Sequence, residues 1–459
     1  MSGHGAPMSS PNPPTLKQRG LRAGAWVIAG YGLSQVVRLG GNLVMTRLLV
    51  PEMFGVMAIA TMVTVILSLL SDIGLSQNIV QSRRGDDAVF LNTAWVVQIV
   101  RGGALWFLAL LLSIVLHLAN LGGLLPAKSV YASPVLPLVI AVSSLSAIIL
   151  GFQSTRLATA TRSFDQRRLV QMELMGQFAA LIVMIVIGMR SRSIWALVAG
   201  GLIASLTTTV LSHTWLGGQP NRFRWGKDAF RELIDFGKWI FVSSAVYVLA
   251  VNGDRLLLGG LIGADVFGLY SIAVLIVGAI EGALNKLFVA VSLPALSETA
   301  RNDPSRLREV HYKLRVPVDL LLLFLAGLLF TSGQLAIDLL YDPRYSAAGG
   351  MLQVLALSLV AVRYGITQQA YLALGTPRYL AIVNVVRFVS LYTLVPLLYY
   401  FAGTQAAIWG IALHALVTVP FIYGFGARLG LIDIRRELLV LVALPVGYLC
   451  GYALNLLWG

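Results

Sequence analysis

The chain of 459 residues is 57% hydrophobic, and only 12% of its residues are Asp, Glu, Lys or Arg. An average soluble domain carries about 25% charged residues, so this composition suits a bilayer and excludes a soluble cytoplasmic enzyme. The single cysteine, Cys450, excludes a disulfide framework and a thiolate metal cluster, and the five histidines have no ligand-like spacing. The net charge of +14 would suit a nucleic-acid partner, so the placement of the charges must decide that question.

The first 22 residues are polar, basic and rich in Pro, Ser and Gly, and we expect a disordered tail over 1–22. From residue 24 onward, apolar stretches follow one another, most of them 20 to 28 residues long. A helix of about 20 residues crosses the roughly 30 Å of hydrocarbon in a bilayer. The pattern predicts an all-α polytopic membrane protein with thirteen spans, at 24–48, 54–79, 90–118, 130–151, 169–189, 194–216, 236–259, 266–291, 315–340, 350–374, 379–401, 405–426 and 437–457.

The cations orient the chain in the membrane. With the N-terminus inside, 23 Lys and Arg fall on inner segments and 5 on outer segments. Inner loops of membrane proteins are enriched in Lys and Arg, so the split predicts a cytoplasmic N-terminus. The same residues are placed to contact the anionic lipids of the inner leaflet. The basic composition therefore reports membrane orientation, and we expect no nucleic-acid partner.

An internal repeat relates the first and seventh spans at an offset of 213 residues without gaps. The matches include Gly24 with Gly237, Trp26 with Trp239, Glu52 with Asp265, Phe54 with Phe267, and Gly55 with Gly268. Both copies begin inside, as in parallel repeats related by a pseudo-two-fold axis along the membrane normal. The pattern predicts a tail (1–22), an N-terminal six-helix lobe (23–216), a basic cytoplasmic linker (217–235), a C-terminal six-helix lobe (236–426) and an additional helix (427–459).

Two stretches carry a resemblance to a known family. Residues 46–81, TRLLVPEMFGVMAIATMVTVILSLLSDIGLSQNIVQ, and residues 252–273, NGDRLLLGGLIGADVFGLYSIA, together with LPAL at 293–296, resemble the polysaccharide transporter family. This is the Wzx-like oligosaccharide flippase branch of the multidrug/oligosaccharidyl-lipid/polysaccharide exporter superfamily. Members of that family are usually assigned 12 or 14 helices, whereas this chain is predicted to have thirteen, so the C-terminal side departs from the pattern.

The resemblance implies two six-helix lobes around a central cavity and transport by alternating access. The implied cargo is an undecaprenyl-pyrophosphate-linked oligosaccharide. It would move from the inner to the outer leaflet of the bacterial cytoplasmic membrane, for exopolysaccharide, O-antigen or capsule synthesis. A polysaccharide polymerase and glycosyltransferases are candidate protein partners for such cargo, although the sequence does not identify them.

Four arginines lie near the middles of predicted spans, where a charge costs at least about 2.5–3.5 kcal/mol and therefore faces protein or water. Arginine suits a pyrophosphate because its planar guanidinium is always charged and binds phosphate oxygens through two hydrogen bonds. The predicted substrate-binding residues are these arginines and their polar neighbours: Arg38, Arg101, Arg363, Arg387, Gln35, Asn42, Asn384 and Tyr364. The alternative is that these arginines pair with acidic residues and only hold the helices together.

The sequence contains no G-x-x-x-x-G-K-[ST] motif, so no ATP site is predicted. An ion gradient, the membrane potential or removal of the cargo would then drive transport. Asp72, Glu173 and Glu281 are the acids available for ion coupling, and they are also the candidate partners of the arginines. We predict no catalytic residues, no metal site and no cofactor.

Two other functions are open at this point. A multidrug-type cation antiporter on the same fold would need carboxylates in its cavity, whereas the mid-span charges here are mainly arginines. A membrane oligosaccharide polymerase or ligase would need catalytic groups in a large outer loop. The longest predicted outer loop, near 119–129, holds about eleven residues and one cation, which disfavours that enzyme.

Overall fold

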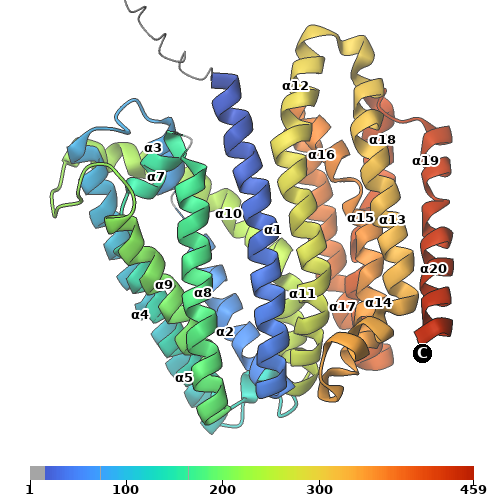
Figure 1. Ribbon diagram of the computed structural model, residues 1–459, viewed down its shortest axis with the longest axis horizontal. Helices are drawn as coiled ribbons and strands as arrows, with labels where there is room; N and C mark the ends of the chain where they lie inside the picture. The colour runs from blue at the N-terminus through green and yellow to red at the C-terminus, as the bar shows by residue number, and fades with distance from the viewer. Residues whose placement is uncertain (1–15, 73, 164, 459) are drawn as a thin grey trace, which may run out of the picture.

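The computed structural model describes residues 16–72, 74–163 and 165–458, and Figure 1 shows an entirely helical bundle over these ranges. Nine of the described helical segments are long and apolar enough to cross a membrane, and a pair bent by 63° makes a tenth. One of the nine, Pro377–Arg428, contains two of the predicted spans. The all-α, multi-pass fold class predicted from the apolar runs is confirmed.

The N-terminal lobe consists of the helices up to residue 214, with α1 packed along α8, and α8 packed along α9. Its elements are α1 (Leu16–Leu48), α2 (Pro51–Leu70), α3 (Leu75–Gln81), α4 (Ala88–Leu121), η1 (Val130–Ala132), α5 (Leu136–Ser143), α6 (Leu145–Gly151), α7 (Arg156–Arg162), α8 (Gln166–Ser191) and α9 (Trp195–Thr214). The C-terminal lobe follows in α10 (Lys227–Leu261), α11 (Ala264–Leu287), α12 (Leu293–Asn302), α13 (Leu307–Leu340), η4 (Pro343–Tyr345), α14 (Ala348–Leu355), η5 (Ala356–Ser358), α15 (Leu359–Val362), α16 (Gly365–Ala373), α17 (Pro377–Leu413), η6 (His414–Thr418), α18 (Val419–Arg428), α19 (Ile434–Val440) and α20 (Ala443–Trp458).

The helix bounds differ from three of the expected segments. Residues 16–22, expected in a disordered tail, begin α1, because Lys, Arg and Leu are good helix formers; residues 1–15 lie outside the described ranges. The last nine residues of the linker 217–235 belong to α10. The span expected at 54–79 breaks after Leu70, because Gly74 adopts a left-handed conformation (φ 60°) that ends one helix and begins α3.

The two ends of the bundle differ in charge. We call the end that carries α3, α7 and α12 the basic end, because cations such as Arg84, Arg162 and Arg306 lie there, and the other end the distal end. α1 starts at the basic end, whereas α20 ends at the distal end (Figure 1). The described chain therefore crosses the bundle an odd number of times. Within α17, Gly403 has a non-helical φ of 73° and separates two crossings.

The helix boundaries repeat with the offset read from the sequence. α1 ends at Leu48 and α10 at Leu261, while α2 begins at Pro51 and α11 at Ala264, and both pairs differ by 213 residues. The contact between α2 and α11 is reciprocal: a Cβ on Gly55 would meet backbone atoms of Ala264 and Gly268, and one on Gly268 would meet backbone of Pro51 and Gly55. Equivalent residues thus face each other across the pseudo-two-fold axis, as in an isologous interface.

Further contacts join the two lobes at the distal end, and we call them, with the Gly55–Gly268 contact, the lobe seam. Tyr345 Oη donates to the carbonyl of Leu49 at 2.8 Å, and Arg344 donates to the last carbonyls of α1 at 3.2 and 3.3 Å. Asp342 accepts a 2.7 Å hydrogen bond from Arg344, which lowers the pKa of that carboxyl and orients the guanidinium. The lobe seam therefore holds the two lobes together at the distal end in this conformation.

Candidate functional site

A pocket of about 270 Å³ lies in the N-terminal lobe between α1, α8 and α9. Arg38 and Asn42 line it from α1, one helical turn apart, and Gln177 lines it from α8. The rest of the lining is apolar and comes mainly from leucine, methionine, valine and alanine side chains, with Phe54 from α2. The predicted residues Arg38 and Asn42 of α1 therefore line a cavity, together with the amide side chain of Gln177 from α8.

Gln177 is held in one orientation by its neighbours. Its Nε2 donates to Ser34 Oγ at 2.6 Å and to Glu173 Oε1 at 3.3 Å. The Oε1 of Gln177 is buried without a hydrogen-bond partner among the described residues, as are Oε1 of Gln35 and Oδ1 of Asn42. Unpaired buried acceptors are rare in folded proteins, and two of these, on Asn42 and Gln177, belong to residues that line the pocket, so a ligand with hydrogen-bond donors is expected there.

A second pocket, of about 200 Å³, lies inside the C-terminal lobe. α10 contributes Asp254 and Arg255, α11 contributes Glu281, and α17 contributes Arg387. Two carboxylates and two guanidinium groups are thus gathered in one cavity. Sequence analysis predicted Glu281 and Arg387 separately, and the fold brings them together.

Hydrogen bonds fix the groups around this pocket. Tyr270 Oη donates to Asp254 at 2.5 Å, and Ser358 Oγ donates to Glu281 at 3.1 Å. His414 Nδ1 lies 2.6 Å from the carbonyl of Ile411, so Nε2 is free to accept from Arg387 Nε at 3.4 Å. Apart from this contact with His414, the Arg387 side chain is exposed. This arginine is therefore available to an anion, whereas the acids beside it are held by neutral donors.

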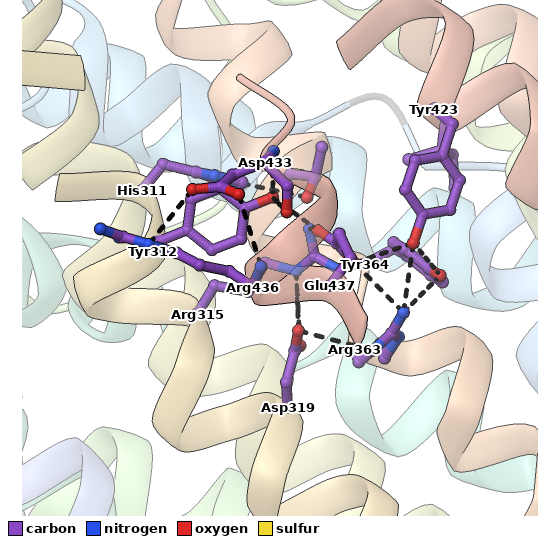
Figure 2. Close-up of polar contacts among 12 residues, drawn as sticks. His311, Tyr312, Arg315, Asp319, Arg363, Tyr364, Tyr423, Asp433, Arg436 and Glu437 are labelled. Atoms are coloured by element: carbon purple, nitrogen blue, oxygen red, sulfur yellow. Dashed lines mark hydrogen bonds and ion pairs between the residues drawn. The ribbon is translucent and has the colours of Figure 1, made fainter. Parts of the chain in front are cut away.

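Arg363 lies instead in a buried ion cluster, which Figure 2 shows. Its guanidinium reaches Glu437 at 3.2 Å and Asp319 at 3.7 Å, and Arg315 makes two bonds to Glu437 at 2.6 and 2.9 Å. All four side chains are at most 5% exposed. The charges of the two arginines and the two carboxylates cancel. In this conformation Arg363 is therefore paired with protein carboxylates and does not line either pocket.

The ion cluster fastens the additional C-terminal helix to its lobe. Glu437 is on α19, and it also accepts hydrogen bonds from Tyr312 of α13 and Tyr423 of α18, each at 2.8 Å (Figure 2). Tyr364, predicted as a substrate ligand, is buried and accepts a 2.7 Å bond from Arg363. Removing one member of a buried ion pair leaves a charge unpaired, so the cluster makes α19 and α20 integral to the lobe.

The remaining predicted residues lie apart from both pockets. Arg101 of α4 donates to Ser71 Oγ at 3.0 Å and to the carbonyl of Ser68 at 2.6 Å, so it caps the end of α2. Asp72 accepts the backbone N–H of Gly74 at 2.9 Å in the turn after that helix. Asn384 is half-buried on α17, one turn before Arg387.

A third cavity, of about 410 Å³, lies towards the basic end and joins the two lobes. Glu173 of α8 and Tyr31 of α1 line it from the N-terminal lobe, and Lys286 of α11 lines it from the C-terminal lobe. The Lys286 ammonium stands 5.7 Å above the ring of Tyr31, a cation–π contact across the lobes. Glu173 thus connects this cavity with Gln177 in the neighbouring pocket.

Sequence reasoning missed several of these groups. Asp254 lies next to Arg255 inside the stretch 252–273. Two adjacent charges within an apolar helix could have indicated a polar site there. Glu437 and Arg315 stood at the predicted ends of spans, where charges are ordinary, so nothing in the sequence distinguished them. Gln177 could have been found from its place one turn after Glu173.

The fold and its pockets define a class: a multi-pass integral membrane protein with two helical lobes and cavities lined by polar side chains. The family model described as polysaccharide biosynthesis protein matches residues 44–349, so the chain belongs to that family. The family predicted from the sequence resemblance is confirmed.

Two curated relatives and two solved structures agree with this assignment. The amylovoran biosynthesis protein AmsL of Erwinia amylovora is 24% identical over 246 residues, which are 52% of this chain and 58% of that protein. The lipopolysaccharide biosynthesis protein WzxC of Escherichia coli (strain K12) is 22% identical over 356 residues, 75% of this chain and 67% of that protein. The match thus spans less than two thirds of the length of AmsL.

Among solved structures, the lipid II flippase MurJ in an inward closed conformation superposes with a TM-score of 0.70 at 13% identity, over 92% of this chain and 91% of that one. An inward-facing multidrug resistance MATE family transporter of the MOP superfamily gives a TM-score of 0.67 at 13% identity, over 90% and 98%. The chain therefore has the two-lobed fold of these transporters.

Proposed function

We propose that this protein is a flippase that moves an undecaprenyl-pyrophosphate-linked oligosaccharide from the inner to the outer leaflet of the bacterial cytoplasmic membrane. The family assignment and the named roles of AmsL, WzxC and MurJ support a lipid-linked polysaccharide precursor. The basic end, where α1 begins, faces the cytoplasm and its anionic lipids, in keeping with the predicted cation split. Glycosyltransferases would then supply the cargo inside, and a polymerase would consume it outside.

One observation carries the proposal: each lobe places an arginine on the wall of a pocket between its own helices. Arg38 lines the N-terminal pocket, and Arg387 lines the C-terminal one. A guanidinium in such a place binds the pyrophosphate of the cargo through paired hydrogen bonds. We leave Arg363 and Arg101 out of the binding set, because protein groups occupy both.

The lobes rock as two bodies in the proposed cycle. The lobe seam joins the lobes at the distal end beside a pocket of about 640 Å³, which Glu52 and Asp265 line from the two lobes, and a cavity of about 410 Å³ lies between the lobes towards the basic end. This state would admit cargo from the cytoplasmic side, and parting of the seam would release it outside.

The C-terminal pocket is the proposed place of ion coupling. Glu281 and Asp254 stand beside Arg387, so a change in the protonation of either acid alters the charge that an anionic headgroup meets. Asp72 is engaged in a turn, and Glu173 positions an amide, so we assign neither of them the coupling role.

Mass spectrometry of lipids from a deletion strain tests the proposal. Loss of the protein should cause glycosylated undecaprenyl pyrophosphate to accumulate, and the intact gene should clear it. Complementation with Arg387→Ala should leave the accumulation in place, at equal protein abundance. Unchanged lipids with altered tolerance to cationic drugs would instead support a drug antiporter.

A further inference from the structure

We propose that the N-terminal pocket between α1, α8 and α9 is a subsite for one sugar ring of the cargo, with sugar hydroxyls donating to Gln177 and Asn42. This inference rests on the proposed function and adds to it a residue, Gln177, and a recognised chemistry, the hydroxyl group. The headgroup arginine Arg38 lies on the same wall, as expected where the sugar follows the pyrophosphate directly.

The orientation of the Gln177 amide follows from its partner. Glu173 as a carboxylate only accepts hydrogen bonds, so the nitrogen of Gln177 must face it and the oxygen must face away. Ser34 Oγ holds the same nitrogen from α1 at 2.6 Å. The oxygen is therefore a fixed acceptor that is buried without a partner, and Asn42 presents a second one from the facing helix.

A ligand that pairs with these two amide oxygens must carry hydrogen-bond donors. An aliphatic lipid chain has none, and a cationic drug has an ammonium donor but would meet the positive charge of Arg38. A sugar ring brings several hydroxyls without a positive charge. Its C–H faces fit the apolar part of the lining, such as Phe54 and Met184.

The size of the pocket limits the occupant. Pockets that enclose drug-sized ligands are about 300–1,000 Å³, so the 270 Å³ here suits one ring and excludes a whole repeating unit. The remaining sugars would extend into the cavity at the basic end, which is lined by Glu173, the hydrogen-bond partner of Gln177.

Binding measurements on the purified full-length protein in lipid nanodiscs test this subsite. The probes are undecaprenyl pyrophosphate alone and the same lipid bearing a single glucose, galactose or N-acetylglucosamine. Gln177→Met keeps the length of the side chain but removes the acceptor. Gln171→Met, earlier on α8 and outside the lining of this pocket, is the matched control.

The wild type should bind at least one sugar-bearing lipid more tightly than the bare lipid. Gln177→Met should weaken that binding by roughly tenfold, the effect of one lost hydrogen bond, and leave the bare lipid unaffected. Asn42→Leu should show the same selective loss, which guards against a folding defect in one variant. Equal weakening for both kinds of lipid, or a wild type indifferent to the sugar, would overturn the subsite alone. A wild type that binds neither would overturn the proposed function as well.

Discussion

Gly55→Ala should open the distal end of the protein. A Cβ at this position falls on the carbonyl oxygen of Ala264, a backbone atom of α11 that cannot rotate aside as a side chain can. Overpacking of this kind costs about 1–3 kcal/mol. In the proposed cycle this contact exists only in the state with the distal ends together, so the cost should fall on that state. The population should then shift towards the open state by about 5- to 150-fold.

Spin labels at Arg47→Cys and Gly260→Cys, in a Cys450→Ser background, would report this shift. These two positions are equivalent in the repeat and stand at the distal ends of α1 and α10. Their distance distribution, measured by pulsed electron paramagnetic resonance, should gain a longer component in Gly55→Ala.

The pseudo-symmetry supplies a second variant and a control. Gly268→Ala should produce the same shift, because its Cβ would meet the backbone of Pro51 in the reciprocal contact. Gly201→Ala should not, because a Cβ there meets nothing within 4 Å. If both seam variants fold and keep the wild-type distribution, the lobe seam does not hold the distal end closed and the reasoning fails.

Three further predictions concern charge. Arg387→Ala should lower transport per unit of folded protein by about tenfold to a hundredfold. Arg387→Lys should recover only part of that loss, because an ammonium lacks the planar guanidinium that makes two parallel hydrogen bonds. Normal export by both variants would contradict the binding role of Arg387. Glu437→Ala should lower stability by about 3–5 kcal/mol, seen as a lower melting temperature, because two buried guanidinium groups are left with Asp319 as their one shared carboxylate; an unchanged melting temperature would contradict the ion cluster's anchoring role. In intact cells without Cys450, Arg344→Cys should react with a membrane-impermeant thiol reagent and Arg306→Cys should not; the reverse pattern would overturn the orientation.

The sequence predicted the fold to the extent that apolar length and repetition determine it. The match of Gly55 with Gly268 at an offset of 213 predicted equivalent positions, and the structure places those two glycines against each other. Breaks within spans were harder to predict, because they depend on single residues such as Gly74, whose left-handed conformation interrupts an otherwise continuous apolar run.

The candidate site was predictable only where a charge stood out in an apolar run. Arg38 and Arg387 stood out in this way and line pockets. Arg363 stood out equally, but its partners Asp319 and Glu437 come from helices distant in sequence, so only the fold shows that it is paired. A burial cost is the same for a binding arginine and a structural one, and sequence alone does not separate them.

Flipping by the purified protein in liposomes tests the central claim most directly. The substrate is undecaprenyl pyrophosphate that carries a short oligosaccharide with a fluorophore on its sugar, and a reductant that cannot cross the membrane destroys the fluorescence of the outer leaflet. The account predicts that wild-type protein exposes the protected inner-leaflet lipid, and that Arg38→Ala and Arg387→Ala slow this by at least about tenfold at equal reconstitution. A protected fraction as stable with wild-type protein as in protein-free liposomes, under an imposed ion gradient or membrane potential, would contradict it.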